Sequence, residues 1–294
     1  MRDSTIDTFK EKWENNRQLA FKETLREGSD IFSWILGRNG FASTAELTEY
    51  LRNKRRVLDA GCGNGRVTAL LKRYAPTTTE IVGIDLISPD IARKNLEAFH
   101  LSDNVLFFER DLLCDLSDLG KFDFIYCQEV LHHISDPEEA LYNLCSLLSS
   151  EGEIAIYVYR KKAPVREFVD DYVRNKISDL PYAKAFCICH QITELGKVLS
   201  QYEIKIRVPK VDVLGIEEGE YDLQRFVYHF FMKCFWNPNL SFQENTAINY
   251  DWYHPQIATR HTLEEVREWF IHTKLKIIHE KVDFYGITVR GKLV

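Results

Sequence analysis

The chain has 294 residues, of which 45% are hydrophobic and 28% charged, an ordinary balance for a soluble globular protein. Its 38 lysines and arginines stand against 44 aspartates and glutamates, and the resulting formal charge of −6 disfavours nucleic acid as a partner. The polar start, apolar runs far shorter than the ~20 residues that span a bilayer, and an odd count of 7 cysteines predict a cytoplasmic protein with reduced thiols and no membrane segment.

The first 52 residues are predicted to be helical, because apolar residues recur there at mixed three- and four-residue spacing. We interpret residues 1–52 as an N-terminal helical lid.

From residue 53 to 160, short β-branched runs alternate with helical patterns, which favours a parallel sheet with right-handed crossovers. The predicted strands are Arg56–Ala60, Ile81–Asp85, Val105–Glu109, Phe122–Cys127 and Glu153–Tyr159, and the predicted helices between them are Arg66–Tyr74, Ile91–Phe99 and Pro137–Leu148. The last of these helices follows a predicted capping box that begins at Ser135, with proline in the first turn.

This rhythm stops at residue 161, and residues 161–260 are interpreted as an inserted, mainly helical, substrate-binding cap. Helices are predicted there at Val165–Ile177 and Tyr221–Phe235. After the insertion, Thr262 and Glu265 predict a capping box that opens another helix. Two closely spaced strands, Leu275–Phe284 and Gly286–Leu293, then predict a hairpin, so the last strand is expected to be antiparallel.

A glycine-rich turn follows the first predicted strand. Gly61, Gly63 and Gly65 form a G-x-G-x-G sequence, in which Arg66 stands where a dinucleotide-binding turn has its third glycine. No Lys-Ser or Lys-Thr follows, so the turn is not a P-loop either. Asp59 at the strand end would repel a pyrophosphate and suits a cationic ligand.

Two further acids end the next predicted strands. Asp85 lies 20 residues after Gly65, where a carboxylate accepts the two hydroxyls of a ribose, and Asp111 is placed to meet an adenine amino group. Each of these turns also has a plain structural reading, as a strand-to-helix connection.

In Val57–Gly65, Asp85, Asp111 and Phe122–His133, the sequence resembles the class I S-adenosylmethionine-dependent methyltransferases. The resemblance covers roughly residues 52–160 and, more weakly, 262–294. It implies a Rossmann-like α/β fold with a seven-stranded, mostly parallel sheet in the order 3-2-1-4-5-7-6. The cofactor-binding residues that it implies are Asp59, Gly61, Cys62, Gly63, Asn64, Gly65, Asp85, Leu86, Asp111, Leu112 and Gln128.

The resemblance implies transfer of a methyl group from S-adenosylmethionine to a small-molecule acceptor, at oxygen or nitrogen, with S-adenosylhomocysteine as product. His133 and His254 are the candidates for a catalytic base. The residues expected to bind the substrate are Arg160, Arg225, Tyr228, Tyr250, Trp252 and Tyr253, since aromatic rings with polar tips suit such a pocket. The plain alternatives are a solvated helix start near Arg160 and a buried core for the aromatic residues.

Cys187, Cys189 and His190 are too closely spaced for a usual zinc site, and no metal is predicted. Two other functions stay open: methylation of RNA or protein, and a catalytically silent protein that binds S-adenosylmethionine. The oligomer is expected to be a monomer or a homodimer.

Overall fold

The computed structural model describes residues 4–87 and 89–294, which form two compact units. The sheet unit comprises Arg17–Arg160 and Thr259–Val294. The helical unit comprises the chain up to Asn16 together with Lys161–Ala258. The first helix therefore belongs to the same unit as the long segment after residue 160.

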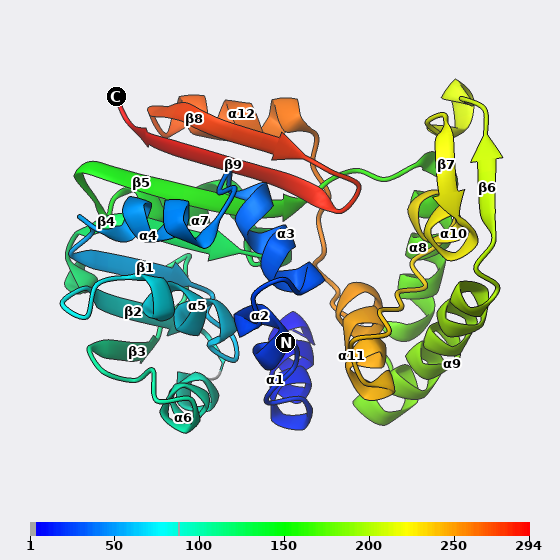
Figure 1. The fold of residues 1–294 in the computed structure, drawn as a ribbon, viewed down its shortest axis with the longest axis horizontal. Helices are drawn as coiled ribbons and strands as arrows, with labels where there is room; N and C mark the ends of the chain where they lie inside the picture. The colour runs from blue at the N-terminus through cyan, green and yellow to red at the C-terminus, as the bar shows by residue number, and fades with distance from the viewer. Residues whose placement is uncertain (1–3, 88) are drawn as a thin grey trace. The chain divides into compact units, whose positions relative to one another are not determined.

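The sheet unit is built on one seven-stranded sheet with the order β3-β2-β1-β4-β5-β9-β8 (Figure 1). The strands are β1 Arg56–Ala60, β2 Glu80–Asp85, β3 Val105–Glu109, β4 Phe122–Gln128, β5 Leu148–Tyr159, β8 Leu275–Val282 and β9 Gly286–Leu293. The first five pair in parallel, and β9 is antiparallel to both of its neighbours. This confirms the predicted order and the reversed last strand.

Helices cover both faces of the sheet, and each face has its own apolar core. One core joins α7 and α12 to residues such as Leu58, Ile125 and Ile156, and the other joins α3, α4, α5 and α6 to Val57, Phe124 and their neighbours. The helices of this unit are α2 Phe21–Leu25, α3 Asp30–Arg38, α4 Thr44–Leu51, α5 Arg66–Tyr74, α6 Pro89–Ala98, α7 Pro137–Cys145 and α12 Leu263–His272, with 3₁₀ turns at Ser117–Leu119 and Leu131–His133. Alternation along each strand sends successive side chains into different cores.

Two predicted capping boxes have different outcomes. The one at α12 is confirmed, because the Thr262 hydroxyl accepts from Glu265 N at 3.2 Å while the Glu265 carboxylate accepts from Thr262 N at 3.0 Å. The prediction for α7 is wrong by one residue. Asp136, and not Ser135, is the N-cap, and its carboxylate accepts from Glu139 N at 3.0 Å. A carboxylate is an equally good cap for the positive end of a helix.

The helical unit contains more regular structure than the sequence predicted. Its elements are α1 Ser4–Asn15, α8 Pro164–Ile177, α9 Tyr182–Gln201, β6 Lys205–Val208, a 3₁₀ turn Asp212–Leu214, β7 Gly219–Asp222, α10 Leu223–Phe230 and α11 Phe242–Tyr253. The prediction of one helix over Tyr221–Phe235 is wrong at both ends. Tyr221 and Asp222 pair with β6 in an antiparallel hairpin, and α10 already ends at Phe230. Across the residues described, no helix is long and apolar enough to span a bilayer.

Candidate functional site

The turn after β1 folds back over the end of β2. Gly61, Gly63 and Gly65 all have positive φ, between 53° and 83°. The Gly61 amide donates to the carbonyl of Ile84 at 2.7 Å, and a Cβ on Gly61 would lie 2.2 Å from Val130 Cγ2. Only glycine fits this conformation and this spacing.

Asp85 holds the turn in place. Its carboxylate accepts from Gly63 N at 2.8 Å and from Ile87 N at 2.9 Å, one bond to each oxygen. The side chain is half-buried at the carboxyl end of β2. The structure therefore brings the glycine turn and Asp85 together.

Asp59 lies beneath this turn. It is 2% exposed, and its carboxylate accepts from the Thr68 hydroxyl at 2.5 Å. Burial is the main reason why the pKa of Asp59 rises to about 7, and the nearby Asp85 carboxylate adds to the rise while the Thr68 hydrogen bond opposes it. The same burial raises the pKa of the Cys62 thiol well above its usual range.

The remaining predicted cofactor residues of the first three strands take different positions. Asp111 and Leu86 are half-buried, and the Asp111 carboxylate accepts from Leu113 N at 2.9 Å. The Arg110 amide bonds to the Asp85 carbonyl at 3.1 Å, which places Asp111 beside the end of β2. The Leu112 side chain packs into the core beneath α7 and α12.

Asn64 anchors the chain that leads into the sheet unit. Its side-chain amide donates to the carbonyls of Arg17 at 3.2 Å and Leu19 at 3.1 Å. Asn95 on α6 donates to Arg17 as well, at 2.8 Å, and to the Asn64 carbonyl at 2.9 Å. The asparagine of the glycine turn thus fixes residues 17–19 over it.

Gln128 is the last residue of β4, and its side-chain oxygen is hydrogen-bonded. The Tyr126 hydroxyl donates to Gln128 Oε1. Gln128 is 7% exposed, and its Nε2 has no hydrogen-bond partner among the residues that the structure describes.

Glu129, the next residue, was not predicted as a site residue. It has a φ of 60°, which is uncommon for a residue with a side chain, and its carboxylate pairs with Arg66 at 2.8 Å. Strained backbone of this kind is concentrated at functional sites. No sequence signal reveals it, because glutamate carries no preference for this conformation.

The two histidines after β4 differ in burial. His132 is fully buried and stacks on Tyr159 with ring centres 3.5 Å apart. His133 is half-buried, and its ring centre lies 4.4 Å from that of His132. His133 is therefore the more accessible of the two at the carboxyl end of β4.

His254 lies in the helical unit with both ring nitrogens engaged. Its Nδ1 is 2.8 Å from the Thr8 hydroxyl and 2.9 Å from the Tyr250 hydroxyl, and its Nε2 is 2.8 Å from the carbonyl of Leu180. Burial lowers the pKa of His254. These bonds join α1 to α11 within one unit.

Two of the predicted substrate residues of the helical unit, Trp252 and Tyr253, bond to one buried carboxylate. Asp170 accepts from Trp252 Nε1 at 2.8 Å and from Lys233 N at 2.9 Å, and lies 2.7 Å from the Tyr253 hydroxyl. It also pairs with the buried Arg166 at 3.1 Å. Within this unit, the Trp252 Nε1 and the Tyr253 hydroxyl are thus hydrogen-bonded to a neighbouring side chain.

The other predicted substrate residues lie in both units. The Arg166 guanidinium lies 4.6 Å from the ring centre of Tyr228, and that of Arg225 lies 5.6 Å from it. Arg160 belongs to the sheet unit, where it donates to the Asp283 carbonyl at 3.1 Å. The roles of these residues toward a substrate stay predictions.

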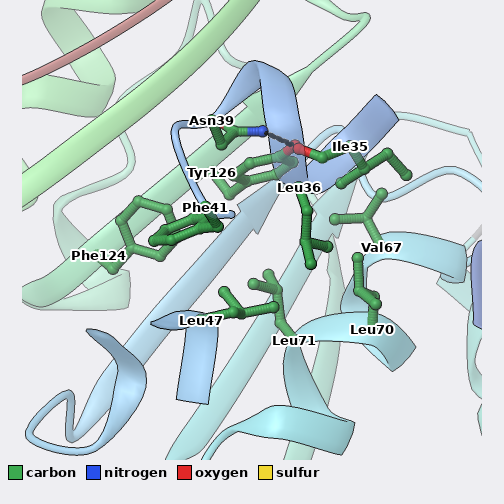
Figure 2. Close-up of a pocket in the computed structure, with 10 residues that line it drawn as sticks. All are labelled: Ile35, Leu36, Asn39, Phe41, Leu47, Val67, Leu70, Leu71, Phe124 and Tyr126. Carbon is green, nitrogen blue, oxygen red and sulfur yellow. Dashed lines mark hydrogen bonds between the residues drawn. The ribbon is translucent and has the colours of Figure 1, made fainter. Parts of the chain in front are cut away.

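A small cavity lies on the α3–α5 side of the sheet (Figure 2). Asn39 and Tyr126 supply its polar atoms, and the Asn39 amide donates to the Tyr126 hydroxyl at 2.9 Å. The other side chains that line it are apolar: Ile35, Leu36, Phe41, Leu47, Val67, Leu70, Leu71 and Phe124. This cavity has no charged lining and is a gap in the core packing.

Comparison with known proteins gives consistent matches. A model described as a methyltransferase domain matches residues 51–226. An uncharacterized protein of Synechococcus is 36% identical over 117 residues, which are 38% of this chain and 28% of that protein. The ubiquinone biosynthesis O-methyltransferase of Coxiella burnetii is 26% identical over 190 residues, 62% of this chain and 76% of that protein.

Among solved structures, the magnesium protoporphyrin IX methyltransferase of Synechocystis with bound S-adenosylmethionine has a TM-score of 0.51 and 14% identity. The match covers 100% of this chain and 98% of that one. At this identity the likeness concerns the fold.

Proposed function

This chain belongs to the methyltransferase domain family, and from that premise we propose that it transfers a methyl group from S-adenosylmethionine to a small-molecule acceptor, at oxygen or nitrogen. The observation that carries the proposal is the hydrogen bond from the Gly63 amide to the Asp85 carboxylate, which holds a turn of three left-handed glycines against the end of β2. The O-methyltransferase from Coxiella burnetii supports a small acceptor.

The residues present fit this cofactor. Gly61 and Gly65 have positive φ and pack closely against Val130 and Leu96, so glycine is required for the turn that brings its backbone to the end of β2. Asp85 stands at the carboxyl end of β2, where a carboxylate can accept the ribose hydroxyls. The buried Nε2 of Gln128 lacks a hydrogen-bond partner among the described residues, and an acceptor on the methionine portion of the cofactor would satisfy it.

When bound, S-adenosylmethionine supplies a methyl group on a cationic sulfur, and attack by an acceptor lone pair breaks the carbon–sulfur bond and leaves the electron pair on sulfur. The protein has to hold acceptor, methyl carbon and sulfur in line and to exclude water. Asp59, once ionised, places negative charge near the glycine turn, where a sulfonium is favoured. His133 is the proposed base for an acceptor that carries a proton.

The test measures transfer of a labelled methyl group from S-adenosylmethionine. The acceptors offered are those in a cell extract and, separately, a panel of phenols, catechols, carboxylic acids and amines. We expect the label in the small-molecule fraction, in equal amount to the S-adenosylhomocysteine that forms. Label that is recovered only in protein or RNA would contradict the proposal of a small acceptor.

A further inference from the structure

Helix α8 of the helical unit buries charged side chains and exposes aromatic ones. Arg166 and Asp170 are 1% and 0% exposed, and they pair with each other at 3.1 Å. Phe168 and Tyr172 lie on the same helix and are 77% and 59% exposed. A surface helix normally buries its apolar face and exposes its charges. The two exposed rings therefore require an explanation, which the proposed catalytic site does not supply.

The two rings belong to a regular apolar stripe. The stripe follows the three- and four-residue spacing that aligns side chains on one face of a helix, and it consists of Val165, Phe168, Val169, Tyr172 and Val173. Each of the five residues is exposed or half-buried. The residues that anchor α8 lie on the side away from the rings, and they are Arg166, Asp170, Arg174 and Ile177. The apolar stripe thus stays accessible on a helix whose polar side is buried.

A patch of this kind differs from a single exposed ring. Tyr202, at the end of α9 in the same unit, is 61% exposed, and isolated apolar residues of this kind are ordinary on protein surfaces. A contiguous apolar patch is instead typical of a surface that another molecule covers.

The α8 segment is complementary to itself in an antiparallel pair. If two copies meet at Asp170, residues equally far before and after this position lie opposite each other. Phe168 then faces Tyr172 of the second copy, and symmetry repeats this contact. At the ends of the segment, the exposed Lys161 faces the exposed Asp179 of the second copy, again twice. Rings thus meet rings, and opposite charges meet at both ends.

Other arrangements fit the same surface less well. A parallel pair would bring Lys161 to Lys161 and Asp179 to Asp179, and it would align the two helix dipoles. Helices that lie on a membrane surface usually carry many basic residues beside the apolar face. Here Asp179 and the partly exposed Asp171 lie near the stripe, and both would be repelled by anionic lipid.

We propose that α8 is the contact surface of a homodimer, in which two copies of the apolar stripe pack antiparallel about a two-fold axis near Asp170. Such an interface is closed, because each copy uses the same patch. One pair of helices buries less than the roughly 1,600 Å² of a standard stable interface, so the dimer is expected to be reversible, with a micromolar dissociation constant. This proposal is independent of the proposed methyl transfer.

The first test is sedimentation velocity between about 1 and 100 μM protein, the range in which a micromolar dimer forms. The wild type should shift from monomer to dimer. Phe168→Ser should raise the dissociation constant at least about tenfold, since aromatic residues dominate such interfaces. Tyr202→Ser, the matched control, removes an exposed ring outside α8 and should dimerise as the wild type does. Equal melting temperatures at the lowest concentration show that both variants are folded.

The second test reverses the charges at the ends of the segment. Lys161→Glu alone and Asp179→Lys alone each place like charges opposite each other, and each should raise the dissociation constant at least about threefold at low salt. An equimolar mixture of the two variants should dimerise as the wild type does. In the mixed pair, opposite charges again meet at both ends.

Three results would overturn the proposal. The first is a wild type that stays monomeric at the highest concentration, and its sedimentation with phosphatidylcholine–phosphatidylglycerol vesicles would then assign the stripe to lipid. The second is a dimer that Phe168→Ser leaves intact, which would place the interface elsewhere. The third is a mixture of Lys161→Glu and Asp179→Lys that dimerises no better than either variant alone, which would exclude the antiparallel pair.

Discussion

At the scale of single residues, the proposed site depends on carboxylates whose environments differ. Asp85 is half-buried and accepts two backbone amides, while Asp59 is 2% exposed and accepts mainly from a hydroxyl. Burial raises the pKa of Asp59 to about 7, and the hydrogen bond from the hydroxyl opposes that rise. Asp59 is therefore largely protonated below neutrality.

Asp59 predicts a pH dependence of stability. Its pKa is raised in the folded state, so the stability that it contributes is present below the unfolded value near 4 and is lost as pH rises through about 7. Between pH 5 and pH 8 the wild type should lose about 3 kcal/mol more than Asp59→Asn, whose amide stays neutral. Urea unfolding at both pH values measures this difference. Equal losses in the two proteins would show that Asp59 is already ionised at pH 5.

His133 predicts a pH dependence of catalysis. A positioned base contributes about 10²–10⁴-fold to rate, so His133→Ala should lower kcat at least about a hundredfold with an acceptor that carries a proton, and leave cofactor affinity unchanged. His272→Ala is the control, since His272 is an exposed histidine of the same unit that pairs with Glu138. The rate of the wild type should rise with pH as the base loses its proton, and that rise should be absent in His133→Ala. A rate profile that His133→Ala leaves unchanged would mean that catalysis relies on positioning alone.

At the scale of elements, the sheet was predictable, whereas in the helical unit only α8 was predicted to within one residue. Strands β1, β3 and β9 and helix α5 have the bounds that the sequence predicted. Each has a strong local pattern with a glycine or a charged residue at one of its ends or next to it. Helix α9 was missed. Few charged residues in Tyr182–Gln201 mark a polar face opposite the apolar one, so the helical period is weak in the sequence.

Within the site, the glycine turn and Asp85 were visible in the sequence. The left-handed Glu129 was not visible, because its conformation depends on which side chains lie nearby in space.

The glycine turn predicts a graded set of stability changes. In Gly61→Ala, positive φ and the contact with Val130 act together, and we expect a loss of about 2–4 kcal/mol. Gly28→Ala is the matched control, with a φ of 79° and no atom within 4 Å of the new Cβ, and should lose only about 1 kcal/mol. Adding Val130→Ala to Gly61→Ala should recover part of the loss in urea unfolding. If Gly28→Ala and Gly61→Ala lose the same free energy, the contact with Val130 has no influence.

At the scale of the whole molecule, the predicted cofactor residues all belong to the sheet unit. The predicted substrate residues, apart from Arg160, belong to the helical unit. The expectation that the helical unit selects the acceptor stays a prediction. If the helical unit selects the acceptor, Tyr253→Ala and Arg225→Ala should lose turnover and keep cofactor affinity.

Replacement of Asp170 should destabilise the helical unit without destabilising the sheet unit. Asp170→Ala leaves the buried Arg166 without its partner, which typically costs about 3–5 kcal/mol. Hydrogen exchange should then increase in α8 and α11, while the affinity for S-adenosylhomocysteine stays that of the wild type. Asp171→Ala is the control, because Asp171 is a more exposed neighbour that pairs with Arg174 at 3.5 Å. A parallel loss of affinity in Asp170→Ala would show that the cofactor site depends on both units.

The central claim is that the carboxyl edge of the sheet binds S-adenosylmethionine through Asp85. Calorimetric titration with S-adenosylhomocysteine tests it most directly, in the wild type, Asp85→Ala and Asp123→Ala. Asp123 is a matched control, since its carboxylate also accepts from two backbone amides, those of Arg55 and Arg56. It lies near the start of β4, at the amino ends of the strands. We predict low-micromolar binding by the wild type and by Asp123→Ala, and affinity at least about tenfold weaker in Asp85→Ala, which loses two charge-assisted hydrogen bonds to the ribose. Unchanged affinity in Asp85→Ala would contradict this account of the site.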